Sequence, residues 1–180
     1  MSSTLISIFA EVSKATRPIW FLNTYVTFPV GAPEGKDDLS VLEHRAPCGD
    51  SPPMHIHHTE DEVFHILEGE LTIRVGNETG RYGPGAVLVA PKGIPHSYRV
   101  DSSEGGRWVT VTAHGDFERF VRAVGREAEN DELPPPVHLS PEAIEQVAAV
   151  ARTFGIELAG PPMERWAGST PASESAQRQS

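Results

Sequence analysis

The stretch GDSPPMHIHHTEDEVFHILEG, residues 49–69, contains most of the chemically distinctive side chains of this 180-residue chain. His55 and His57 stand two residues apart, so on a β-strand both imidazoles point to the same face. Glu62 follows five residues later, after the polar turn 58–61, and can reach the same place. The stretch therefore predicts two strands joined by a turn, with two imidazoles and a carboxylate gathered between them.

A second stretch, GAVLVAPKGIPH at residues 85–96, supplies a further histidine. His96 opens a short predicted strand directly after the turn Gly93-Ile94-Pro95. A lone histidine is usually an ordinary surface or hydrogen-bonded residue, and only the combined spacing favours another role. Three neutral imidazoles and one carboxylate form a mixed nitrogen and oxygen site, which suits a borderline divalent ion and leaves coordination positions open. We expect one ion of Mn, Fe, Co, Ni or Cu, held by His55, His57, Glu62 and His96.

Around these stretches, residues 18–113 consist of short β-rich runs separated by Gly, Pro, Asn and Asp. Many short strands with turn residues between them are typical of an all-β barrel or sandwich. The clearest runs cover residues 20–28, 39–44, 71–75, 87–89 and 108–112.

The rest of the chain has a different pattern. Apolar residues spaced three and four apart predict an amphipathic helix from Asp116 to Glu129, with Asp116 as its cap. Ser140 and Pro141 predict the start of a second helix that runs to Gly155. We expect three parts: a β-barrel with its N-terminal extension (1–115), a helical appendage that packs on the barrel or on a neighbouring subunit (116–167), and a disordered tail (168–180).

The spacing within the two stretches resembles that of the cupin superfamily. Gly49, His55, His57, Glu62 and Gly69 match the first cupin motif, and Gly85, Pro91, Gly93 and His96 match the second. The second motif usually closes with Asn where this chain has Val100, but that Asn is not a metal ligand. The resemblance covers about residues 41–113, and the wider layout is similar to single-domain bacterial proteins of the quercetin (flavonol) 2,3-dioxygenase type. It implies an antiparallel jelly-roll β-barrel with the metal inside one end, and a homodimer.

Composition excludes several classes of protein. The net charge of −10 and the scattered Lys and Arg residues argue against a nucleic-acid-binding surface. The N-terminal residues lack the pattern of a signal peptide, and no stretch is long and apolar enough for a membrane span. Cys48 is the only cysteine, so an internal disulfide is excluded and a thiolate metal site is not expected. We expect a cytoplasmic protein.

Three functions fit these residues. By resemblance, the first is a metal-dependent dioxygenase that cleaves a flavonol-like or other enolic aromatic substrate with O₂, with Glu62 as the catalytic base. The second is a metal-dependent isomerase, lyase or decarboxylase of a small metabolite. The third is a non-enzymatic cupin that binds a small ligand. Fold alone does not decide between them.

The remaining polar and aromatic residues receive simpler interpretations. The turn residues His58, Glu60 and Asp61 are expected to face solvent. His65 alternates with the residues that face the site, so it is expected to point away from it. Tyr98 and Trp108 are expected at the border of the cavity or in the core. No spacing supports a role for three other histidines, which are expected at the surface: His44, His114 and His138.

Overall fold

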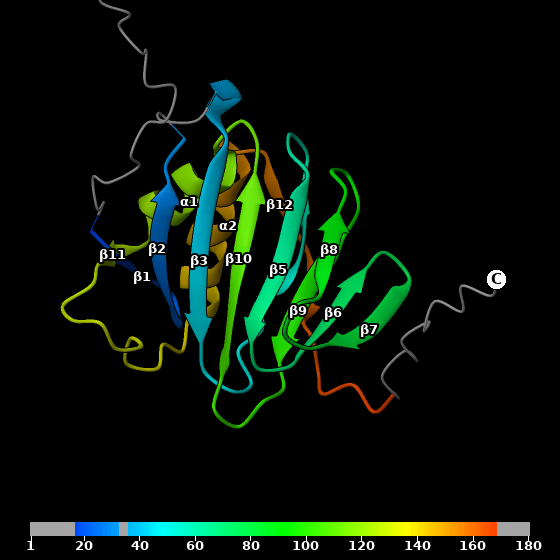
Figure 1. Cartoon of the computed structure of the whole chain (residues 1–180). Helices are drawn as coiled ribbons and strands as arrows, with labels where there is room; N and C mark the ends of the chain where they lie inside the picture. Colours follow the sequence, from blue (N-terminus) through cyan, green and yellow to red (C-terminus); the bar gives the residue numbers. More distant parts are fainter. Residues whose placement is uncertain (1–16, 33–35, 169–180) are drawn as a thin grey trace, which may run out of the picture.

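The structure is a computed structural model that describes residues 17–32 and 36–168. It consists mainly of antiparallel strands, with two α-helices near the C-terminal end (Figure 1). The expected N-terminal extension up to residue 16, and the expected tail beyond Gly168, lie outside the described residues. The elements are β1 (Ile19–Phe21), β2 (Thr24–Val30), η1 (Lys36–Asp38), β3 (Ser40–Ala46), β4 (Pro53–His57), β5 (Glu62–Glu68), β6 (Leu71–Val75), β7 (Glu78–Tyr82), β8 (Val87–Ala90), β9 (His96–Val100), β10 (Gly106–Thr112), α1 (Asp116–Val124), β11 (Arg126–Glu127), α2 (Pro141–Thr153) and β12 (Ile156–Pro162).

The strands form two antiparallel sheets. The larger sheet has the order β11-β1-β2-β3-β10-β5-β8, and the smaller one has the order β12-β4-β9-β6-β7. Strands far apart in the sequence are therefore neighbours: β10 lies between β3 and β5, and β9 lies between β4 and β6. The predicted fold class, an all-β jelly roll followed by a pair of helices, is confirmed.

The core lies between the sheets because alternate residues of the long strands point inward. In β3 and β10 every second residue is buried, as the period of two requires. Ile66 and Trp108 of the larger sheet pack in one cluster with Leu71 and Ile73 of the smaller sheet. This shared core holds the two sheets face to face and fixes the position of the strands that carry the histidines.

Three elements differ from the sequence-based expectations. The run 20–28 is two strands, because the chain turns at Leu22 (φ 53°) and β1 pairs with β2. The first helix ends at Val124, since Arg126 and Glu127 leave it to pair with β1. Its N-cap is Gly115 rather than Asp116.

The second helix begins as predicted, but the chain after it was not foreseen. Ser140 caps α2 by accepting a hydrogen bond from the backbone N–H of Ala143 at 3.2 Å. Residues 156–162 then form β12, which pairs with β4 so that Leu158 lies opposite His55. The C-terminal segment thus completes the sheet that carries the three predicted ligand histidines, two on β4 and one on β9. No helix in the described part of the chain is long and apolar enough to cross a membrane.

Candidate metal centre

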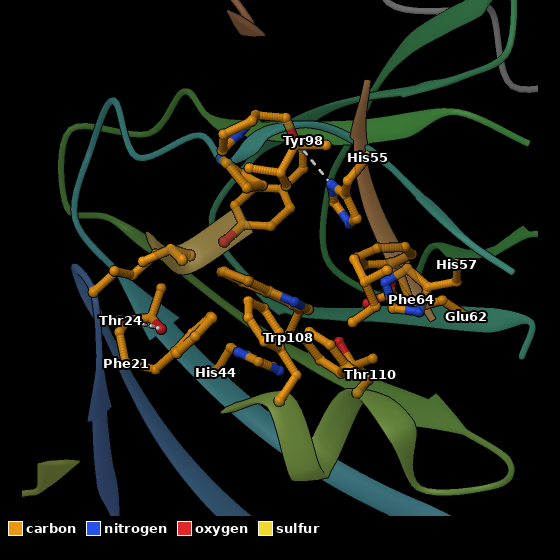
Figure 2. Close-up of a pocket in the computed structure, with 18 of the residues that line it drawn as sticks. Phe21, Thr24, His44, His55, His57, Glu62, Phe64, Tyr98, Trp108 and Thr110 are labelled. Atoms are coloured by element: carbon orange, nitrogen blue, oxygen red, sulfur yellow. Dashed lines mark hydrogen bonds and ion pairs between the residues drawn. The ribbon is translucent and has the colours of Figure 1, made fainter. Parts of the chain in front are cut away.

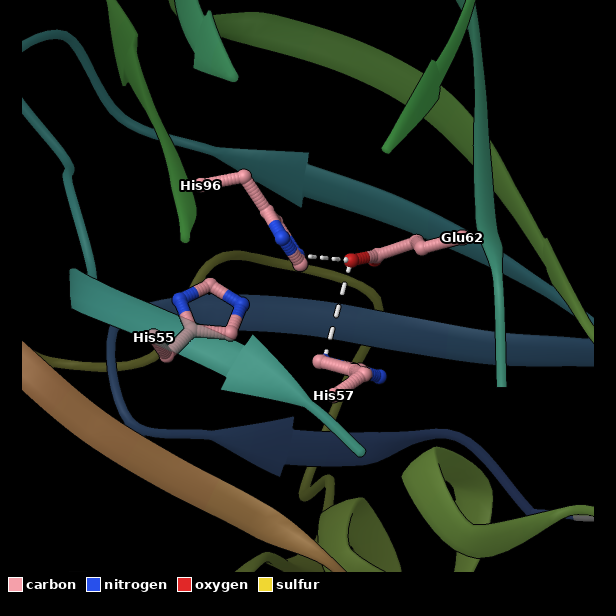
Figure 3. A group of neighbouring side chains, drawn as sticks. All are labelled: His55, His57, Glu62 and His96. Atoms are coloured by element: carbon pink, nitrogen blue, oxygen red, sulfur yellow. Dashed lines mark hydrogen bonds and ion pairs between the residues drawn. The ribbon is translucent and has the colours of Figure 1, made fainter. Parts of the chain in front are cut away.

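Three strands bring the predicted ligands together. His55 and His57 lie on β4, Glu62 opens β5, and His96 opens β9. His55 and His96 are directly opposite each other in the pairing of β4 with β9. One ligand atom from each of the four residues lies within 4.8 Å of the others, and the four side chains point toward a common centre (Figure 3).

Backbone contacts hold two of the imidazoles in one orientation. The Nδ1 atom of His55 lies 2.8 Å from the carbonyl oxygen of Pro53, and Nδ1 of His96 lies 2.9 Å from that of Ile94. Because a carbonyl only accepts, each Nδ1 carries the proton and donates it. In the neutral ring this fixes the tautomer and leaves Nε2 with a lone pair directed into the site, the arrangement common among metal-binding histidines.

His57 provides the test of whether these residues fit a metal ion. Its side chain is buried, and neither ring nitrogen has a hydrogen-bond partner among the described residues. Its Nε2 atom lies 3.8 Å from Glu62 Oε2, too far for a hydrogen bond. A buried nitrogen without a partner is costly, and an ion at the centre of the group would supply one. The donor set of three imidazoles and one carboxylate also suits a borderline divalent ion.

The protonation states of the group depend on burial and on charge. Burial, together with the positive charge of His96 and His57, lowers the pKa of His55 to about 3. Burial alone would raise the pKa of Glu62, but a hydrogen bond from His96 and the charge of the imidazoles lower it to about 2. Glu62 Oε2 accepts that hydrogen bond from His96 Nε2 at 2.9 Å, so the His96 ring carries both protons in this arrangement, and although burial lowers the pKa of His96, the hydrogen bond and charge of Glu62 raise it. Metal binding would release the Nε2 proton. Near neutral pH, His55 is therefore neutral and Glu62 ionised, which are the states that metal ligation requires.

Glu60 does not face solvent as expected from its place in the turn. It is only 1% exposed, and Oε1 accepts a hydrogen bond from the backbone N–H of Phe117 at 2.6 Å. The same oxygen lies 3.5 Å from Nδ1 of His57, on the side of the ring away from Glu62. A contact between distant parts of the chain explains this burial, because α1 begins beside the turn and covers the Glu60 carboxylate. The other turn residues keep their exposure, with His58 paired to Glu157 at 2.9 Å.

An apolar cavity with a volume of about 110 Å³ adjoins His55, His57 and Glu62 of this group, with room for several water molecules (Figure 2). Both sheets and both helices contribute to its wall, so the C-terminal helices help to form the site. No Lys or Arg is among the residues that line it, and Glu62 is the only acidic one. The wall is mostly aromatic and aliphatic: Phe21, Leu22, Pro52, Pro53, Phe64, Tyr98, Trp108, Phe117, Phe120, Leu139, Ile144, Val147, Ile156 and Leu158.

Tyr98 and Trp108 border this cavity, and so does His44, for which a surface position was predicted. That prediction is wrong: His44 is 3% exposed, and its ring stacks on Trp108 with 5.1 Å between centroids. It lies on β3 directly opposite Trp108. The alternation of buried and exposed residues along β3 could have indicated from the sequence that His44 points inward. His65, His114 and His138 are exposed.

Comparisons with known proteins agree with this fold and site. The cupin-domain family model matches residues 41–112. Quercetin 2,3-dioxygenase of Bacillus subtilis (strain 168) is 34% identical over 94 residues, which are 52% of this chain and 28% of the relative. The chain thus spans less than a third of that protein's length.

Among solved structures, the polyketide cyclase RemF from Streptomyces resistomycificus is 20% identical, with a TM-score of 0.48 over 86% of this chain and 99% of that one. KdgF from Halomonas sp. is 16% identical, with a TM-score of 0.46 over 51% and 80%. The matching family model and the ligand spacing on two motifs identify residues 41–112 as a cupin domain, and the chain resembles the quercetin 2,3-dioxygenase type.

Proposed function

We propose that this protein is a metal-dependent dioxygenase that cleaves an enolic aromatic substrate of the flavonol type. One observation carries the proposal: a cavity walled by aromatic and aliphatic side chains opens onto His55, His57 and Glu62 of the four-residue group. A flat, uncharged molecule gains from such a wall. A phosphorylated or carboxylated metabolite would meet no Lys or Arg among the described lining residues.

In this proposal His55, His57, Glu62 and His96 hold one divalent transition-metal ion. When bound, the ion would orient the enolic oxygen of the substrate and O₂ and stabilise the charge that develops on them. Glu62 has the second role of accepting the enolic proton. Its ionised state supports that role, as does its place at the point where the cavity meets the imidazoles. The wall excludes bulk water from the reacting atoms.

The similarity to quercetin 2,3-dioxygenase supports the reaction type. A homodimer is also part of the proposal. Strand β8 is an edge of the larger sheet, and it leaves Val87 and Val89 62% and 52% exposed. Apolar edge strands of this kind favour pairing with another chain.

The test is oxygen consumption by the metal-loaded protein with a flavonol such as quercetin. We expect substrate-dependent uptake of O₂ that disappears when a chelator removes the metal and returns when the metal is restored. Product formation without O₂ uptake would instead indicate the isomerase, lyase or decarboxylase alternative. Tight binding of flavonols without any conversion would indicate a ligand-binding module and contradict the proposed reaction.

Glu60 provides a prediction about the ion itself. Replacing Glu60 with Gln removes the carboxylate behind His57 and should weaken metal affinity about 10- to 100-fold, because such partners orient the ligand ring and raise its basicity. Glu157→Gln is the matched control, since Glu157 pairs with another histidine, His58, but both lie exposed. Competition between the protein and a chelator for Ni²⁺ or Mn²⁺ measures the affinities. Equal affinities of wild type and Glu60→Gln would contradict a supporting role for Glu60.

A further inference from the structure

Two buried polar atoms in the cavity have no hydrogen-bond partner in the part of the chain that the structure describes and no role in the proposed metal centre. They are Nε2 of His44 and Oγ1 of Thr110, on side chains that are 3% and 1% exposed. Both residues line the apolar cavity, where Figure 2 shows them on the same side as Trp108. Buried polar atoms are nearly always hydrogen-bonded, and leaving one unpaired lowers stability. Two such atoms in one cavity point to a ligand that supplies the missing bonds.

Ring contacts and strand pairing relate these two residues to the metal centre. The Phe117 ring lies 6.0 Å from the ring of His44 and 5.4 Å from that of His57. Thr110 lies opposite Phe64 in the pairing of β10 with β5, two residues along from the position opposite Glu62. A molecule in this cavity can therefore contact the imidazole group, the rings of Phe117 and Phe64, and these two residues.

The chemistry of the pair restricts what it can bind. Burial lowers the pKa of His44 to about 4, so its imidazole is neutral near neutral pH. A neutral imidazole nitrogen donates or accepts one hydrogen bond according to its tautomer, and a threonine hydroxyl can both donate and accept, so both suit an uncharged polar group. With no Lys or Arg in the wall, an anionic group would be desolvated there without compensation.

We infer that His44 and Thr110 form a polar subsite that binds a hydroxyl or carbonyl group of a flat aromatic ligand, a group other than the one held at the metal centre. This inference rests on the proposed function for the kind of ligand, an enolic aromatic. It adds that the ligand carries a second polar group, and that this group decides which aromatic compounds are selected.

The first test needs no ligand. Thr110→Val removes an unpaired hydroxyl and keeps the shape, so the melting temperature of the ligand-free protein should stay equal or rise. Thr112→Val is the matched control on the same strand, because the Thr112 hydroxyl lies 3.0 Å from that of Ser40 and shares a hydrogen bond with it. Its melting temperature should fall. An equal fall in both variants would show that the Thr110 hydroxyl is already satisfied inside the protein, and would overturn the inference.

The second test measures binding to metal-loaded protein without O₂. The probes are 3-hydroxyflavone and the analogue with one more hydroxyl on its pendant phenyl ring. Wild type should prefer the analogue, and Thr110→Val and His44→Phe should each lower that preference about fivefold to tenfold while Thr112→Val leaves it unchanged. Preferences unaltered in both variants would overturn the inference.

The pair 2-naphthol and naphthalene-2,6-diol separates the subsite from the proposed reaction. These compounds lack the flavonol skeleton. Even if wild type rejects flavonols, it can still prefer the diol over 2-naphthol, and Thr110→Val and His44→Phe can still weaken that preference. That result would support the subsite and contradict the flavonol substrate. If the variants lose the preference for the flavone with the extra hydroxyl, and wild type consumes O₂ with a flavonol, both the subsite and the proposed reaction are supported.

Discussion

Replacing Glu62 with Gln is expected to lower turnover per bound metal ion by about 10² to 10⁴, the usual cost of removing a general base. Three imidazoles remain in this variant, so part of the metal should stay bound. The amide of Gln is almost the same shape as the carboxylate but cannot accept the enolic proton. Turnover should therefore fall far more than metal content does.

The measurement combines elemental analysis with oxygen uptake at saturating flavonol, so that activity is expressed per ion. Glu62→Asp provides the comparison, because it keeps a carboxylate at the same strand position and should recover part of the lost rate. Near-normal activity per ion in Glu62→Gln would show that Glu62 only positions the metal. Deprotonation of the substrate would then occur elsewhere or before binding.

The fold and the gathering of His55, His57, Glu62 and His96 could be predicted because their signals are local. His55 and His57 stand two residues apart on a strand and therefore point to the same face, and the short turn after His57 limits where Glu62 can lie. His96 is more distant in sequence, but its turn and strand carry their own spacing. The strand alternation around Trp108 and Phe64 was likewise readable, since each run is short and half-buried.

What could not be predicted depends on contacts between distant parts of the chain. Glu60 looks like a solvent-facing turn residue until α1 packs beside it and its carboxylate meets the Phe117 N–H. Strand β12 follows a helix and contains Gly160, Pro161 and Pro162, which weaken any strand signal. It forms because β4 offers it a free edge, and the end of the chain thereby becomes part of the site's sheet.

His44, whose inward position the alternation of β3 could have indicated, leads to the second large effect. Its burial makes the protonated form unfavourable in the folded state, where the pKa falls from 6.5 to about 4, and the charges of Glu62 and Glu43 offset this only in part. Between these two values the unfolded chain binds a proton that the folded protein does not. Stability from this residue is therefore complete above pH 6.5 and is lost progressively as pH falls toward 4.

Over that range the contribution of His44 amounts to about 3 kcal/mol, since one pKa unit corresponds to about 1.4 kcal/mol. His44→Phe keeps a ring against Trp108 but cannot titrate, so its free energy of unfolding should fall less between pH 6.5 and pH 4 than that of wild type. Urea denaturation of the metal-free proteins measures the difference, because release of an ion cannot then contribute. The titration of His55 contributes equally to wild type and variant, so it cancels in the comparison. His138→Phe, at an exposed position, should follow wild type. If the free energy of unfolding falls equally with pH in wild type and His44→Phe, then His44 takes up its proton in the folded protein as readily as in the unfolded chain. That result would contradict the lowered pKa that burial gives His44.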